Sequence, residues 1–89
     1  MPAELVSHAD SGSESVHGSV VASVWAALTR SPTLEGHWKM RVFCDHPPQV
    51  RVVMVSPEGL TRHWQFDRAD NGMLEAIERG VGDWIDAGL

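Results

Sequence analysis

Three strand-like runs in the middle of the chain, joined by two short connections, constrain its fold more than any other feature. They cover residues 37–45, 50–56 and 60–67, and they alternate polar with apolar residues or are rich in β-branched ones. Such runs are typical of strands, and short connections between consecutive strands favour hairpins. The sequence therefore predicts an antiparallel three-stranded meander.

The two connections of this meander, residues 46–48 and 57–59, indicate its register. Pro57 favours a type I turn, and Gly59 suits the left-handed position that follows it. We expect pairing across the connections to place Val52 opposite both Val42 and Trp64, so that one sheet face is apolar. The apolar residues of that face are Trp38, Met40, Val42, Cys44, Val50, Val52, Leu60, Trp64 and Phe66.

Two helical patterns flank the strands. Over residues 15–30 the apolar residues recur at helical spacing, and Ser31 before Pro32 ends the pattern. Over residues 70–86 they form a narrower stripe, with charged residues on the opposite side. Each helix has one apolar face, so we expect both to pack side by side on one face of the sheet. The stripes consist of Val20, Val21, Val24, Trp25 and Leu28, and of Met73, Leu74, Ile77, Val81, Trp84 and Ile85.

The ends and glycines of the second helix add detail. Asp67 or Asp70 is placed to cap its start, and Gly88 to close its end. Gly80 borders the apolar stripe, which predicts a close approach to a neighbouring element. Gly82 faces solvent, and the sequence offers no reason for it.

The expected fold is therefore α+β: a two-layer sandwich of order helix, three-stranded antiparallel meander, helix, with both helices on one sheet face. A length of 89 residues allows one domain. We assign residues 15–89 to this α-β-β-β-α domain and residues 1–14, which show no periodicity, to a flexible N-terminal tail. Each predicted element holds one core-facing tryptophan: Trp25, Trp38, Trp64 and Trp84.

The sequence also indicates where such a chain works. A single cysteine, Cys44, excludes an internal disulfide and fits a reducing compartment. The first twelve residues lack the basic start and apolar run of a signal peptide, and no apolar stretch approaches the length of a membrane span. We expect a soluble, cytoplasmic protein without contact to a membrane.

No arrangement of residues in the sequence predicts catalysis, a metal site or a cofactor. Cys44 and His46 lack a second pair at zinc-like spacing. His37 and His63 belong to outer strands of the meander, which keeps them apart. Cys44 belongs to the expected core, and the serines cluster in the expected tail, so neither supplies an activated nucleophile. We therefore expect a protein that is not an enzyme.

The order helix–three strands–helix resembles the double-stranded-RNA-binding domain in topology alone. That family holds phosphates with a lysine-rich start to its second helix. Here residues 67–72 contain Asp67 and Asp70 against Arg68, which places acids where a phosphate would lie. The resemblance implies, as an alternative, an RNA-contacting domain that lacks the usual basic helix start and uses Phe43 and the arginines of the same sheet face.

The sheet face opposite the helices, which we call the open face, is the predicted binding surface. Its residues mix apolar with basic types, and solvated sheet faces are usually polar. Valines there also supply strand propensity, yet an apolar centre ringed by arginines is typical of protein interfaces. The predicted partner-binding residues are Lys39, Arg41, Phe43, Arg51, Val53, Val55 and His63, with Thr61 and Gln65 on the same face.

These patterns predict a small acidic module that binds another protein and acts as an inhibitor or as an accessory or adaptor protein. The net charge is −5, with acidic residues at both ends and a mildly basic middle, which disfavours broad contact with nucleic acid. A homodimer through the open face is a second possibility. The acidic side of the last helix, around Glu75 and Glu78, is the other candidate surface.

Overall fold

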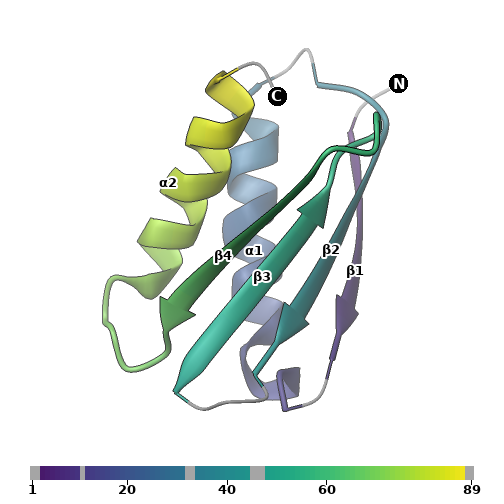
Figure 1. The fold of residues 1–89 in the computed structure, drawn as a ribbon. Coiled ribbons are helices and arrows are strands. Elements are labelled where there is room, and N and C mark those ends of the chain that lie inside the picture. Colours follow the sequence, from purple (N-terminus) through teal and green to yellow (C-terminus); the bar gives the residue numbers. More distant parts are fainter. Residues whose placement is uncertain (1–2, 11, 32–33, 45–47, 88–89) are drawn as a thin grey trace.

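The computed structural model describes residues 3–10, 12–31, 34–44 and 48–87. It is an α+β structure with two helices and a four-stranded mixed sheet (Figure 1). Its elements in chain order are β1 (Glu4–Ala9), α1 (Glu14–Thr29), β2 (His37–Phe43), β3 (Gln49–Val55), β4 (Thr61–Asp67) and α2 (Met73–Asp86).

The prediction of a flexible tail is wrong for residues 4–9, which form β1 and make the sheet four-stranded. β1 is parallel to β2, and its N–H groups bond to β2 or its flank, from Glu4 to Gly36 and from Asp10 to Val42, both at 2.9 Å. Its residues alternate between exposed and partly buried. Polar composition hides this strand, because only Leu5 and Val6 are large and apolar. β1, α1 and β2 together form a βαβ unit, in which the helix joins two parallel strands.

The remaining strands follow in sheet order, and β2–β3 and β3–β4 are antiparallel. Val52 lies opposite Val42 on one side and Trp64 on the other, as the connections predict. Gly59 has φ +91°, in the left-handed region where glycine is favoured. Ser56 closes this turn, donating its N–H to the carbonyl of Leu60 at 2.8 Å and accepting the N–H of Leu60 on its hydroxyl at 3.0 Å.

One core joins the helices to alternate residues of the strands. Figure 1 shows α1 behind the strands and α2 next to α1, beside β4. The buried apolar residues are Val16, Val20, Val24, Ala27 and Leu28 of α1; Trp38, Met40, Val42, Cys44, Val50, Val52 and Met54 of β2, β3 and their flank; and Met73, Ile77 and Val81 of α2.

Three of the four tryptophans form a connected group, which also holds the core together. Trp84 meets Trp38 and Trp64 edge to face, with ring centroids 5.9 and 5.6 Å apart. The prediction that Trp25 faces the core is wrong, because its side chain is 42% exposed. The buried face of α1 includes Val16 and Ala27, which lie on the side of the helix away from Trp25, so Trp25 is at the rim of the core. Leu60, also expected in the core, is 44% exposed.

α2 begins later than predicted, at Met73, and neither expected aspartate caps it. Asp67 instead accepts the N–H of Ala69, and Asp70 that of Gly72, so both stabilise the turn before the helix. Gly88 lies outside the described residues. The close approach predicted at Gly80 is present, since a Cβ there would lie 3.0 Å from Nε1 of Trp64.

Candidate open-face interface

The open face is the surface of the sheet that points away from the buried core. It brings all seven predicted partner-binding residues onto three adjacent strands. Arg41 and Val53 lie opposite each other at its centre, and His63 is the next residue across on β4. Exposure differs along the face: the charged side chains are exposed, while Phe43, Val53 and Val55 are half-buried.

β1 extends the open face by residues that the sequence analysis placed in the tail. Val6 lies beside Lys39 and is 59% exposed, and His8 lies beside Arg41. A shallow hollow of about 220 Å³ forms where β1, β2 and β3 meet. Its lining includes Val6, His8, Lys39, Arg41, Val53 and Val55. The apolar part of this face is therefore larger than predicted, and Val6 is its most exposed member.

Arg41 is held in place by Asp10, which follows β1. Its Nε and Nη2 atoms donate to the two carboxylate oxygens of Asp10 at 3.0 and 2.7 Å. This hydrogen bond, together with the charge of Arg41, lowers the pKa of Asp10 below its ordinary value of 3.8, and Asp10 in turn raises the pKa of Arg41. A bidentate pair fixes the guanidinium before any partner arrives.

Phe43 lies between two arginines at one end of the open face. The guanidinium carbons of Arg41 and Arg51 are 5.1 and 4.7 Å from its ring centroid. Each contact has cation–π geometry. The ring and the two cations thus form one compact group, which orders three long side chains at the surface.

The polarity of residues 4–9 carries no signal that could have revealed the β1 part of this face. Glu4, Val6 and His8 are exposed, whereas the residues between them are half-buried. This alternation of burial has no counterpart in the sequence, where Leu5 and Val6 are adjacent apolar residues. Asp10 also carried no signal, because its ion pair with Arg41 depends on the parallel pairing of distant segments.

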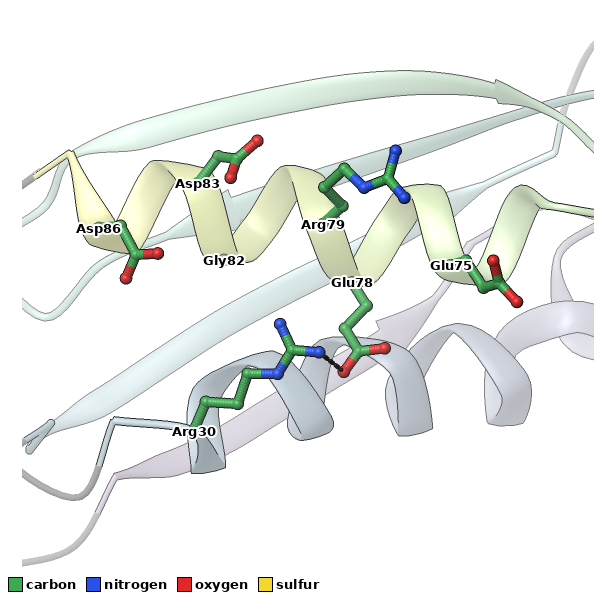
Figure 2. Close-up of a pocket in the computed structure, with 7 residues that line it drawn as sticks. All are labelled: Arg30, Glu75, Glu78, Arg79, Gly82, Asp83 and Asp86. Atoms are coloured by element: carbon green, nitrogen blue, oxygen red, sulfur yellow. Dashed lines mark ion pairs between the residues drawn. The ribbon is translucent and has the colours of Figure 1, made fainter.

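The second candidate surface is a groove between α2 and the end of α1 (Figure 2). Arg30 reaches from α1 to Glu78 of α2, with Nη2 and Oε1 2.8 Å apart. The other lining residues are Glu75, Arg79, Gly82, Asp83 and Asp86. Figure 2 shows charged side chains along α2 and the ion pair that joins Glu78 to Arg30, the residue directly after α1.

Across residues 3–10, 12–31, 34–44 and 48–87, no three His, Cys, Asp or Glu side chains gather closely enough to hold a metal ion. Cys44 is a buried free thiol, as expected for a core residue, and His46 lies outside the described residues. In the described part of the chain, neither helix has the length and apolar character to cross a bilayer.

Comparison of the chain with protein-family models, curated proteins and solved structures gave no match.

Proposed function

We propose that this chain is a cytoplasmic, non-catalytic module that binds another protein through its open face, as an inhibitor or as an accessory or adaptor protein. The observation that carries the proposal is the apolar area around Val6, Val53 and Val55, bordered by arginines already fixed by neighbours. Apolar centres with ordered arginines are typical of binding hot spots. Because these arginine side chains are already ordered, less conformational entropy is lost when a partner binds.

The fixed position of Arg41 also bears on the RNA alternative. The charge of Arg41 is neutralised by Asp10, and the guanidinium groups of Arg41 and Arg51 both lie against the ring of Phe43. A base would have to compete for that ring, and a phosphate would have to compete with a carboxylate. These contacts favour a protein partner over RNA.

Capture from an extract of the native host tests this proposal. Val53→Asp places an unpaired charge at the centre of the face and should abolish retention of the partner. Val53→Thr keeps the β-branched shape and should retain it. Glu75→Lys changes the other candidate surface and should also retain it. Nuclease treatment should make no difference.

Three results would contradict the proposal. Loss of the partner in Glu75→Lys, with retention in Val53→Asp, would assign binding to the acidic helix. Loss on nuclease treatment, with steep weakening by salt, would favour the RNA-contacting alternative. Retention by every variant would leave the open face without a role.

Arg51→Glu is a better charge variant than Arg41→Glu, because a glutamate at position 41 would lie beside the carboxylate of Asp10.

A further inference from the structure

β1 is a sheet edge whose outer backbone groups have no partner strand in the described structure. Glu4 and Asp10 point their N–H groups toward β2 or its flank. By the alternation of a strand, Leu5, Ser7 and Ala9 point theirs away from the sheet. Figure 1 shows α2 beside β4, whereas β1 is the outermost element on its side. β1 has neither proline nor lysine, the residues that usually protect an edge.

We infer that a second copy of this chain pairs with β1, antiparallel, with Val6 opposite Val6 of the partner subunit. Leu5 then exchanges backbone hydrogen bonds with the partner's Ser7. Glu4 lies opposite the partner's His8, and the two-fold axis repeats this contact. The resulting structure is one continuous sheet made from two copies.

Charge favours this register over the one shifted toward Asp10. Shifting the pairing by two residues would place Glu4 opposite the partner's Asp10, which brings two carboxylates together. Within its own chain Glu4 lies 3.0 Å from Nδ1 of His37, and His8 lies 3.6 Å from Asp10. In the proposed register each Glu4 carboxylate also meets the partner's His8, which adds an opposite charge when that imidazole is protonated. Val6 is 59% exposed and gains an apolar neighbour. These contacts are between non-hydrogen-bonded pairs, where side chains of antiparallel strands approach most closely.

The helix side of β1 also fits a second copy. An apolar hollow lies there beside Trp25, which is 42% exposed. Its lining consists of Ala3, Glu4, Leu5, Val21 and Trp25. In the proposed register the partner's Ala9 lies opposite Ala3 and covers part of this hollow. Pairing between the β1 strands of two copies therefore gives hydrogen-bond partners to the free backbone groups, brings Glu4 and His8 together, and covers exposed apolar residues.

This dimer would leave both open faces on the same side of the joined sheet. It shares Val6 and His8 with the open-face hollow, whereas Val53 and Val55 at the centre of the face stay uncovered. A target with two sites would then bind two open faces with increased avidity.

Sedimentation velocity over a hundredfold range of concentration tests the dimer. The wild-type chain should shift from monomer to dimer. Ser7→Pro removes an N–H that points to the free edge and should leave the chain monomeric throughout. Val53→Asp, at the centre of the open face, should dimerise like the wild type. Circular dichroism checks that each variant remains folded.

Charge exchange tests the register without depending on proline. In a homodimer of Glu4→Lys, each new lysine lies opposite the partner's His8. In a homodimer of His8→Glu, each new carboxylate lies opposite the partner's Glu4. Each variant alone should dimerise at least several-fold more weakly than the wild type. An equimolar mixture should recover the dimer, because the heterodimer contains one Lys–Glu and one His–Glu pair.

Contrary outcomes are distinct. A wild-type chain that stays monomeric over the whole range overturns the inference, as does a folded Ser7→Pro that dimerises normally. Loss of the dimer in Val53→Asp alone would assign self-association to the open face. A mixture no stronger than its components would exclude the proposed register even if Ser7→Pro fails to fold.

Discussion

Trp84 is the residue on which the aromatic part of the core depends, since its ring contacts both Trp38 and Trp64. Trp84→Ala should lower the free energy of unfolding by about 3 kcal/mol, because it removes both contacts and leaves a cavity. Trp25→Ala, at the exposed rim, should cost less than about 1 kcal/mol. Denaturant unfolding of the two variants measures the contrast, and equal losses would mean that the two tryptophans are similarly packed.

Gly80 and Gly82 lie one residue apart on either side of Val81 and should respond oppositely to alanine. A Cβ at Gly80 would lie 3.0 Å from Nε1 and 3.3 Å from Cδ1 of Trp64, whereas at Gly82 the nearest atom is Nη1 of Arg30 at 3.9 Å. Gly82→Ala should gain up to about 1 kcal/mol of helix propensity. Gly80→Ala should lose stability, because displacing the indole costs more than that gain. Thermal melts of both variants provide the measurement.

The Asp10–Arg41 pair should contribute to the acid sensitivity of folding. The pKa of Asp10 is lowered in the folded chain, chiefly by the hydrogen bond from Arg41. The carboxylate therefore stabilises the fold at pH values above its unfolded pKa, and this stability is lost as pH falls through the lower folded pKa. Asp10→Asn should be less stable than the wild type at neutral pH, and the difference should shrink below about pH 4. A constant difference across this range would show that the ion pair adds nothing to folding.

At the level of elements, β1 has two sides whose residues should differ in their effect on stability. Leu5 is half-buried against the core, and Val6 is exposed on the open face. Leu5→Thr should lower the free energy of unfolding by about 1–2 kcal/mol through lost burial. Val6→Thr keeps the branched shape and should change it by about 0.5 kcal/mol or less. Both are measured at low concentration, where the monomer dominates, and the reverse order would contradict the orientation of β1.

The elements predicted best from the sequence are those whose register is decided locally. The pairing of Val52 with both Val42 and Trp64 follows from nearby turns, and so does the left-handed Gly59. β1 was missed because its partner is supplied by a distant segment and its composition is polar. The prediction that Trp25 faces the core is wrong for a related reason. Its side chain lies at the edge of the core beside β1, a strand that the sequence did not predict.

The candidate site was predictable to the same extent. Lys39, Arg41 and Val53 share a face because strand alternation requires it, so the meander brought them together in advance. The sequence could not show that Asp10 binds Arg41 or that Val6 enlarges the apolar area. Both depend on the parallel pairing of β1, which no local pattern encodes.

The molecule as a whole has its charges divided between two sides. On the open face Lys39 and Arg51 are exposed cations, while Arg41 is paired with Asp10. The groove beside α2 contains Glu75, Asp83 and Asp86 together with Arg30 and Arg79. The rate of association with an acidic partner surface should therefore depend on which of these two sides carries the changed charge.

Arg51→Glu and Arg79→Glu make the same change in net charge on these two sides. Arg51→Glu should slow association with the captured partner several-fold at low salt, because it weakens steering toward the open face. Arg79→Glu, on α2, should have a much smaller effect. Both differences should decline as salt shortens the screening length to about 8 Å at physiological ionic strength. Equal slowing by the two variants would indicate a response to net charge alone.

The parallel pairing of β1 also sets an order in time. Pairing of Glu4 with His37 closes a loop that contains the whole of α1 and the connection after it, whereas each hairpin closes a loop of a few residues. Closing the longer loop costs more entropy, so we expect β1 to be the last of the described strands to join the sheet. By the same reasoning it is the first to detach from a folded chain. When it does, it uncovers a vacant place on β2 that the corresponding strand of another copy fits equally well, which gives two chains a route to exchange their first strands.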